Sequence, residues 1–321
     1  MLVTPEKAKA LVESGKLLHI SGAESLLKEL PRGNWIGGST EYFLGEGGGS
    51  VTDALISVVE LPFDRFKIVS YDADSIAGIV GDTYDNGFTL AIVPFDSPVH
   101  RKYALESAQW EGLYLSAILG WVAGYHLSST RQTAVTVNGY TGAVSETGAA
   151  ALHVELPQGK TAQIDIINIF EPDRERPSVF FAEDTLEVKD CAIGGKVVNF
   201  ARHLRENQVN TKLPLVGDYS GAYVNVSFKE IVGDTVYLYA PVAAGIEYHL
   251  ARGVDDYESA FREKLDLIED SSDYVFACNC ILNFLYGGLE GKDLGSLYGP
   301  VTFGEIAWQV INQTLVYLRV R

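Results

Sequence analysis

Phe303-Gly304-Glu305-Ile306 and Asn312-Gln313-Thr314-Leu315-Val316 lie near the C-terminus, and this stretch decides how we interpret the fold. Residues 313–320 are rich in apolar and β-branched side chains, which is typical of a buried strand. Residues 274–278 form a second run of this kind, and polar residues follow it. The stretch therefore predicts strands whose ends carry polar side chains.

Other runs of strand length extend back toward the N-terminus. We expect strands at residues 55–61, 66–71, 88–95, 133–137, 149–156, 162–170 and 178–182. Residues 149–156 and 162–170 are expected to pair with each other. Residues 223–232 and 235–241 predict a hairpin around Gly233-Asp234.

Helical patterns separate these strands. Residues 1–30 predict two short helices, and Thr4-Pro5 supplies an N-cap followed by proline. Ser97-Pro98 predicts a long helix that ends near residue 120, and we interpret residues 113–127 as buried helix. Two more helices are expected, over residues 196–207 and behind the capping pattern of residues 255–258, the latter with one apolar face: Tyr257, Phe261, Leu265, Ile268.

This mixture predicts an α/β (mixed α+β) protein with two packed halves, in which helices flank mixed or antiparallel sheets. The halves are expected at residues 1–210, with a β-rich middle segment, and at residues 211–321. Residues 36–61 and 213–242 each run from a glycine-containing loop into strands, which suggests a loose duplication.

The composition limits the kinds of partner that we expect the protein to bind. Hydrophobic residues make up 47% of the 321 residues, enough for a sizeable core. Lysine and arginine number 25 against 42 acidic residues, a formal net charge of −17. Such a surface repels phosphate backbones and anionic lipid, so we expect neither a nucleic-acid nor a membrane partner.

The cysteines and the N-terminus bear on location. Only Cys191, Cys278 and Cys280 are present, which favours a reducing, cytoplasmic setting over a disulfide scaffold. Charged residues interrupt residues 1–20, so no signal peptide is expected. No Cys/His spacing indicates zinc, and no cofactor or metal is expected.

Gly45-Glu46-Gly47-Gly48-Gly49 is the first candidate for a site, because backbone amides in such loops can approach phosphate. The loop lacks a Lys-Ser/Thr pair and leads into a strand, so a turn or lid is the better interpretation.

Cys278-Asn279-Cys280 is the second candidate. A nucleophilic cysteine needs a basic neighbour and some exposure, and His249 is the best available partner. Because Cys278 ends an apolar strand, a buried structural cysteine is the better interpretation.

Polar groups at strand ends form the third candidate, because loops at such ends commonly build ligand sites. A carboxylate beside amides and hydroxyls suits a ligand with an amino group. Alternatively, Glu305 pins a turn, and both interpretations stay open. The predicted ligand-binding residues are Ser39, Thr40, Glu41, Cys280, Asn283, Gly304 and Glu305.

A fourth candidate, Asp218-Tyr219-Ser220-Gly221, places an acid near a hydroxyl. Turn chemistry explains these residue types at least as well, so no catalytic residue is predicted.

Two segments resemble the FIST sensory domain. Ile36-Gly37-Gly38-Ser39-Thr40-Glu41 is similar to its N-terminal strand and loop. The strand before Cys278, the Gly304-Glu305-Ile306 element and the final Asn312 strand are similar in order to its C-terminal part. Asn279 and Cys280 stand where the family often has arginine, so no carboxylate-binding role is transferred.

The resemblance implies small-ligand sensing, with amino acids or their derivatives as ligands and signal transduction as the output. We therefore expect a sensory protein that acts alone, as a homodimer or through a signalling partner, with no evident catalysis. Two alternatives stay open: a hydrolase or transferase that uses Cys278 or Cys280, and a non-enzymatic interaction scaffold.

Overall fold

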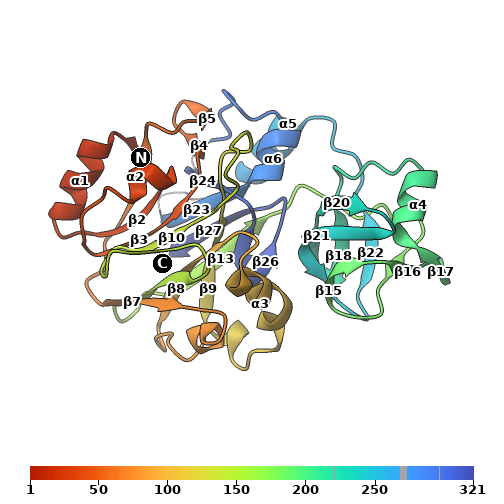
Figure 1. Cartoon of the computed structure of the whole chain (residues 1–321), viewed down its shortest axis with the longest axis horizontal. Coiled ribbons are helices and arrows are strands. Elements are labelled where there is room, and N and C mark those ends of the chain that lie inside the picture. The colour runs from red at the N-terminus through yellow and green to blue at the C-terminus, as the bar shows by residue number, and fades with distance from the viewer. Residues whose placement is uncertain (220, 268–272, 296) are drawn as a thin grey trace.

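The computed structural model describes residues 1–219, 221–267, 273–295 and 297–321. Figure 1 shows a larger body, which contains both ends of the chain, and a smaller lobe beside it. The lobe contains α4 and the strands from β14 to β22, while the body contains strands from before and after this segment. The mixed α+β class expected from the sequence is confirmed, with sheets that contain parallel and antiparallel pairs.

Three six-stranded sheets form the body. The first has the order β1-β6-β2-β3-β10-β11. Its strands are β1 (Leu2–Val3), β6 (Ile56–Leu61), β2 (Leu17–Gly22), β3 (Trp35–Ser39), β10 (Thr136–Asn138) and β11 (Ala143–Ser145).

The second sheet has the order β7-β12-β8-β9-β25-β26. Its strands are β7 (Phe66–Tyr71), β12 (Ala149–Glu155), β8 (Gly87–Pro94), β9 (Ala117–Ala123), β25 (Glu305–Ala307) and β26 (Gln309–Ile311). The third has the order β13-β27-β23-β24-β4-β5. It contains β13 (Ala162–Ile167), β27 (Leu315–Val320), β23 (Tyr274–Cys280), β24 (Gly299–Thr302), β4 (Tyr42–Gly45) and β5 (Gly48–Val51).

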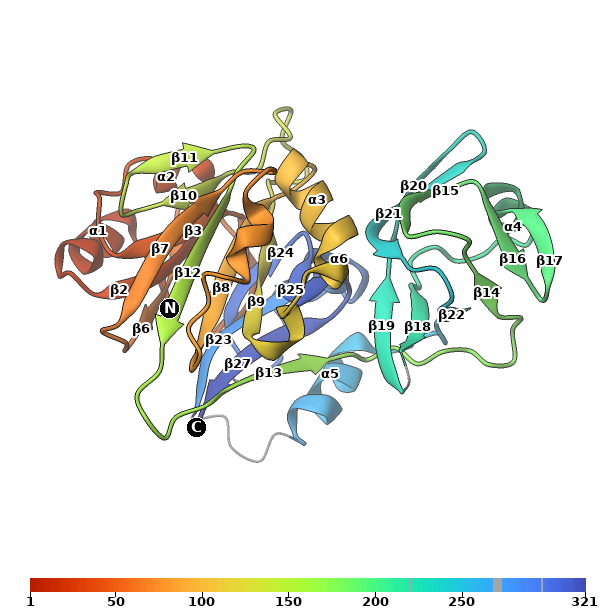
Figure 2. The same cartoon turned by 90° about the horizontal axis from the view of Figure 1, so that it is seen from below.

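The three sheets repeat one topology, and each repeat is called a unit here. In every unit a strand crosses over to a parallel neighbour, giving the pairs β2–β3, β8–β9 and β23–β24. A helix lies in each crossover: α2 (Glu24–Leu27), α3 (Pro98–Glu106) and α6 (Ile281–Tyr286). The first strand of each pair also has an antiparallel neighbour, respectively β6, β12 and β27. Figure 2 shows the three sheets side by side in the body.

Each unit also lends a hairpin to another unit. The hairpin β10–β11 of the second unit extends the first sheet, and β25–β26 of the third unit extends the second. The hairpin β4–β5 of the first unit pairs with β24 and so extends the third sheet. These exchanges close a ring, so the body has approximate threefold symmetry. The symmetry differs from the expected duplication, in which residues 213–242 matched residues 36–61.

Three buried side chains with rings, one from each unit, meet in the core. Nε2 of His19, in β2, accepts a 2.8 Å hydrogen bond from Nε1 of Trp121, in β9. The His19 ring also lies 4.7 Å from the Phe276 ring of β23, centroid to centroid. Burial lowers the pKa of His19 to about 3, so the ring is neutral and can accept this bond.

The small lobe is inserted between β13 and β23. It has a six-stranded sheet, a three-stranded sheet (β15-β21-β20) and its own apolar core. The order of the larger sheet is β17-β16-β14-β22-β18-β19, which joins strands from both sides of the expected boundary between residues 210 and 211. The lobe contains β14 (Val179–Phe180), β15 (Thr185–Val188), β16 (Asp190–Ile193), β17 (Lys196–Asn199), α4 (Phe200–Glu206), β18 (Leu215–Tyr219), β19 (Ala222–Val226), β20 (Phe228–Val232), β21 (Thr235–Val242) and β22 (Glu247–Leu250).

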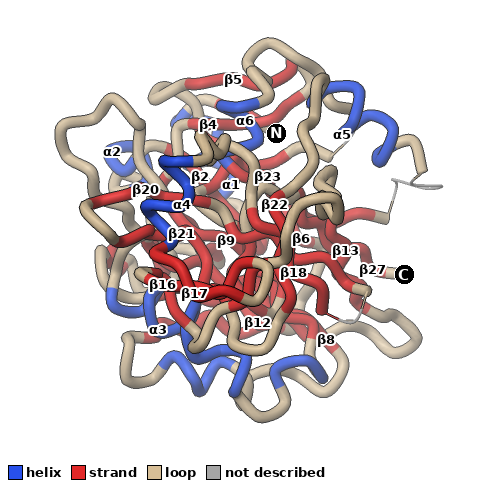
Figure 3. Tube along the Cα trace, turned by 90° about the vertical axis from the view of Figure 1, so that its right-hand side faces the viewer, coloured by secondary structure: helices blue, strands red, loops and turns tan. Residues whose placement is uncertain are grey.

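Figure 3 shows α3 and α5 (Tyr257–Leu265) on opposite sides of the molecule. Asp256 caps α5 by accepting a hydrogen bond from the backbone of Ser259, while Ile268 of the expected apolar face lies outside the described residues. At the N-terminus, α1 (Pro5–Glu13) is capped by Thr4 as expected, and the buried strand β2 separates it from α2.

Several expected elements are wrong. The helix from Ser97 ends at Glu106, and residues 117–123, interpreted as helix, form β9. This strand is buried on both faces, so its continuous apolar run does not distinguish strand from helix. The helix expected from residue 196 starts only at Phe200, after β17.

Two expected connections also differ. Strands β12 and β13 do not pair with each other: β12 lies between β7 and β8, whereas β13 pairs with β27. The glycine-rich loop is the β4–β5 hairpin. The hairpin around Gly233-Asp234 is confirmed as β20–β21.

Candidate functional site

The carboxyl ends of β3, β9 and β24 meet at one end of the body. Gly124, after β9, donates its backbone N–H to the carbonyl of Ser39, at 2.8 Å. Thr40 donates its hydroxyl to the carbonyl of Val301, at 2.7 Å. Phe303 donates its backbone N–H to the carbonyl of Val122, at 3.0 Å. Each pair of units therefore meets at a junction. Ser39 and Thr40 lie where the first unit meets the other two, whereas Gly304 and Glu305 lie where the third unit meets β9 of the second.

The first junction joins the first and second units and contains a cavity. Its volume is about 220 Å³, and Ser39, Thr40 and Glu41 line it together with residues of the loop after β9. The complete lining is Ala23, Glu24, Ser25, Ser39, Thr40, Glu41, Gly124, Tyr125, His126, Ser129, Arg131 and Thr133. The residues from the loop and from the start of α2 are not among those predicted from the sequence.

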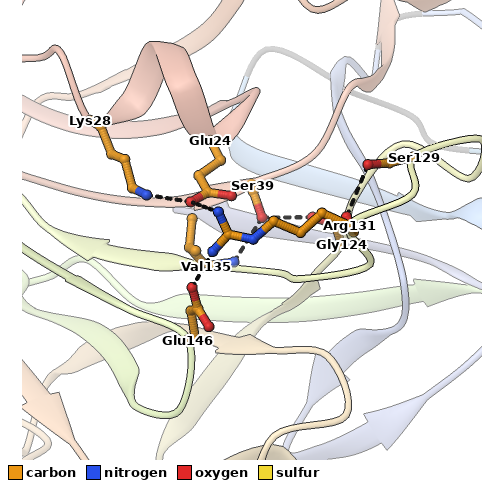
Figure 4. A network of polar contacts seen from close by, with 8 residues as sticks. All are labelled: Glu24, Lys28, Ser39, Gly124, Ser129, Arg131, Val135 and Glu146. Atoms are coloured by element: carbon orange, nitrogen blue, oxygen red, sulfur yellow. Dashed lines mark hydrogen bonds and ion pairs between the residues drawn. The ribbon is translucent and has the colours of Figure 1, made fainter.

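Ser39 holds the wall of this cavity in place. Its hydroxyl donates to the carbonyl of Gly124, at 2.6 Å, and accepts from the backbone N–H of Val135, at 2.9 Å. Figure 4 shows both bonds beside Arg131. Because both contacts join β3 to the segment after β9, Ser39 has a structural role in addition to its place in the lining.

Acidic groups outnumber basic groups around the cavity. Arg131 pairs with Glu146, at 2.5 Å, and lies 3.6 Å from Glu24, which also pairs with Lys28. Figure 4 shows the Arg131 guanidinium between the two carboxylates. The two cations are thus already matched by Glu24 and Glu146, and the carboxylate of Glu41 is additional.

Glu41 and Glu24 are both partly buried carboxylates of the lining, and, among the described residues, only Glu24 is paired with cations. Within the described ranges, no hydrogen bond or ion pair reaches the carboxylate oxygens of Glu41. Burial raises its pKa, and the nearby His126 opposes this increase. A cation beside Glu41 would restore part of the lost solvation and stabilise its charged form.

Aromatic rings support the same wall. The Tyr42 and His126 rings are stacked, with centroids 5.6 Å apart and planes inclined by 12°. The Tyr42 hydroxyl accepts a 3.0 Å hydrogen bond from the backbone of Leu127. These contacts fix the loop that carries His126 against the residue next to Glu41.

The other predicted residues form a buried cluster within the third unit, where β25 pairs with β9 of the second unit. Glu305 is fully buried, and its carboxylate accepts from the hydroxyls of Thr314, at 2.7 Å, and Thr302, at 3.1 Å. The Asn283 amide donates to Oδ1 of Asn279, at 2.9 Å. Cys280 is fully buried, and Gly304 has a φ of 154°.

Burial controls the protonation of Glu305. It raises the pKa to about 8, although hydrogen bonds from Thr314 and Thr302 oppose this shift. Glu305 joins the turn between β24 and β25 to the turn before β27. Of the two interpretations drawn from the sequence, these contacts support the one in which Glu305 pins a turn, and Glu305 does not line the 220 Å³ cavity.

Three buried asparagines give this end of the body unusual polarity. Nδ2 of Asn279, Oδ1 of Asn283 and both amide atoms of Asn312 have no hydrogen-bond partner among the described residues. Buried amides of this kind commonly bind internal water.

The second junction, between the second and third units, is filled by aromatic side chains. Phe303 contacts Phe95 and Tyr125, with centroids 5.3 Å and 4.9 Å away. Tyr239 of the small lobe also lies near Phe95, at 5.9 Å. Gly124 is required here, because a Cβ would lie 2.2 Å from the Phe303 ring.

The cysteines are poorly placed for nucleophilic chemistry. Cys191, Cys278 and Cys280 are all buried and free, which confirms the expected burial of Cys278. Burial raises the pKa of the Cys278 and Cys280 thiols well above their usual value, and the nearby Glu305 acts in the same direction. His249 lies in β22 of the small lobe, where Nε2 is 3.1 Å from Glu247.

The Asp218 segment is a turn within the described residues. Asp218 accepts from the backbone of Gly221, at 2.7 Å, and pairs with Arg174, at 2.9 Å. Ser220, the hydroxyl in the predicted motif, lies outside the described residues. No group of three His, Cys, Asp or Glu among the described residues is placed to hold a metal ion.

The fold and site define a mixed α+β protein of three repeated units, with an inserted lobe and a polar cavity at one junction between units. The chain belongs to a family of unknown function (DUF6976), whose model matches residues 3–321. A search of curated proteins found no match. No helix within the described ranges is long and apolar enough to cross a membrane.

Proposed function

We propose that this protein binds a small molecule with a protonated amino group, such as an amino acid or a derivative, in the cavity at the first junction. The observation that carries the proposal is the half-buried Glu41 carboxylate, which lines the cavity without a partner among the described residues. Binding serves a sensory or signal-transduction role in the cytoplasm, with the output passed to a second copy or a partner protein.

The lining supports this class of ligand in two ways. Hydroxyl groups of Ser25, Ser129 and Thr133 offer hydrogen bonds to a small polar molecule. The ring of His126, stacked on Tyr42, lines the cavity near Glu41 and adds a further hydrogen-bonding group. The volume of about 220 Å³ favours a metabolite smaller than a nucleotide.

Binding without catalysis is the function that the geometry supports best. The buried, protonated thiols of Cys278 and Cys280 do not favour the alternative of a cysteine hydrolase. The polar, acidic cavity favours a ligand-binding protein over a scaffold without a ligand.

Thermal-shift screening followed by calorimetry tests the proposal. The panel contains amino acids, the corresponding amines without the carboxylate, and N-acetylated amino acids that lack the cation. We expect saturable stabilisation by members with a free amine, because a ligand that binds only the folded state raises its stability. Acetylation should abolish it.

Glu41→Gln provides the residue test. Losing a charge-assisted contact of about 1.5–3 kcal/mol should weaken binding at least tenfold. Glu46→Gln is the matched control, because Glu46 is exposed in the turn of the β4–β5 hairpin and does not line the cavity. Equal affinity in Glu41→Gln and wild type, or equal binding of acetylated ligands, would refute the proposal.

A further inference from the structure

The small lobe contains a second cavity, of different chemistry. It has a volume of about 250 Å³ and lies between α4 and the lobe's sheets. Nine of its twelve lining residues are apolar, among them Phe200, Leu204 and Phe228 of the lobe core. A lining of this kind favours contact with a hydrocarbon group over contact with water.

The polar residues of the lining are Arg176, His203 and Asn207. Arg176 pairs with Asp173 through its Nε atom, at 3.1 Å. Its terminal Nη atoms form no hydrogen bond or ion pair with the residues that the structure describes. They form a fork of N–H donors, which matches a carboxylate.

His203 and Asn207 belong to the same side of α4. Asn207 donates its amide to the carbonyl of His203, at 2.8 Å, and the Nδ2 atom also lies 3.3 Å from Nδ1 of His203. The cavity therefore combines an apolar wall with cationic and hydrogen-bonding groups. This charge pattern is unexpected in a chain with a formal net charge of −17, where most of the surface would repel an acid.

We propose that the lobe cavity binds a small carboxylic acid with a compact apolar body, such as a medium-chain fatty acid or a phenylalkanoic acid. The apolar body lies against Phe200, Leu204 and Phe228, and the carboxylate meets Arg176. An apolar cavity of about 150 Å³ in another protein admits benzene, so about 250 Å³ accommodates a phenyl ring with a short acid chain. This site is separate from the Glu41 cavity and does not depend on its function.

Calorimetric titration of the full-length protein with 4-phenylbutyrate and hexanoate tests the site. The matched neutral ligands are 4-phenylbutanol and hexanol. We expect one equivalent of each acid to bind, with the alcohols about tenfold weaker because they lack the charged contact. Absence of binding, or equal affinity for acids and alcohols, would overturn the proposal.

Three variants locate the binding. Arg176→Gln should weaken the acids about tenfold and leave the alcohols unchanged. Leu204→Trp should fill the cavity and abolish binding of both. Arg202→Gln should change neither, because Arg202 is exposed on α4 and does not line the cavity.

Circular dichroism and the melting temperature check that each variant folds. Should Leu204→Trp fail to fold, the contrast between Arg176→Gln and Arg202→Gln decides the question. Unchanged acid binding by Arg176→Gln would place the acids elsewhere and reject the proposal. Glu41→Gln should bind 4-phenylbutyrate with the affinity of the wild type. The test of the lobe cavity is therefore independent of the test of amine binding at the first junction.

Discussion

The hydroxyl of Thr40 donates a 2.7 Å hydrogen bond to the carbonyl of Val301, across 261 positions of sequence. The bond joins the end of the first unit's β3 to the third unit's β24, beside the pairing of β24 with β4. Both residues are buried, so water cannot take the place of this hydrogen bond. It is one of the contacts that close the ring of three units.

Thr40→Val should destabilise the protein by about 1–3 kcal/mol, because it keeps the shape but leaves the Val301 carbonyl unsatisfied. The variant also removes the acceptor for the backbone N–H of Tyr42. Urea unfolding measures the effect. Thr147→Val is the control, because Thr147 is exposed. Equal midpoints for the two variants would mean that the Thr40 bond contributes little.

Gly124→Ala should destabilise the first and second junctions together. A Cβ at this position would lie 2.2 Å from the Phe303 ring, so the aromatic cluster must shift, at a cost of about 1–3 kcal/mol. Gly47→Ala serves as the control, because a Cβ there meets nothing within 4 Å. Differential scanning calorimetry should show a lower melting temperature for Gly124→Ala alone, and equal melting temperatures would contradict the prediction.

Buried histidines should make the fold sensitive to acid. Burial lowers the pKa of His19 to about 3 and those of His100 and His153 to about 4. Unfolded histidine titrates near 6.5, so below this pH the unfolded chain binds more protons. Stability is therefore complete above pH 6.5 and decreases as the pH falls toward 4, by up to about 1.4 kcal/mol per pH unit and group.

Unfolding free energies from urea titrations at pH 7.0, 6.0 and 5.0 measure this slope. A flat profile over that interval would show that the three rings are not kept neutral by the fold.

The pKa shift of Glu305 should give the opposite dependence of stability on pH. Its pKa is about 8 in the folded protein and about 4.5 in the unfolded chain, so the folded state binds the extra proton between these values. Its contribution is complete below pH 4.5 and decreases as the pH rises toward 8. Glu305→Gln mimics the neutral acid. Between pH 6.5 and 8, the free energy of unfolding should therefore decrease less for this variant than for the wild type.

The measurement is the difference in unfolding free energy between pH 6.5 and 8.0 for wild type, Glu305→Gln and the exposed control Glu46→Gln. If Glu305→Gln and wild type have equal differences, the carboxyl of Glu305 is ionised throughout this interval.

Local patterns predicted individual strands better than their partners. The runs at β6, β7, β8 and β12 are recognisable because β-branched and apolar residues dominate them. The partner of β12 could not be predicted, because the adjacent strand β13 joins a different sheet. Strand β9 was mistaken for helix because both of its faces are buried.

The site was predictable only in part. Ser39, Thr40 and Glu41 line the cavity as a strand-end interpretation expects, but His126 and Arg131 come from a loop of another unit. No local motif marks that loop. The C-terminal group around Glu305 was expected to share the cavity, and the structure places it in a separate buried cluster within the third unit.

The sequence by itself determined the mixed α+β class, the acidic surface, the burial of Cys278 and the polar character of the strand ends. These properties depend on composition and on short-range periodicity, which each segment carries within itself. Only the tertiary structure decided the threefold ring, the inserted lobe and the isolation of Glu41 from Glu305. Hairpin exchange and parallel crossovers join residues that are far apart in sequence, and their register depends on complementary surfaces that no single segment contains.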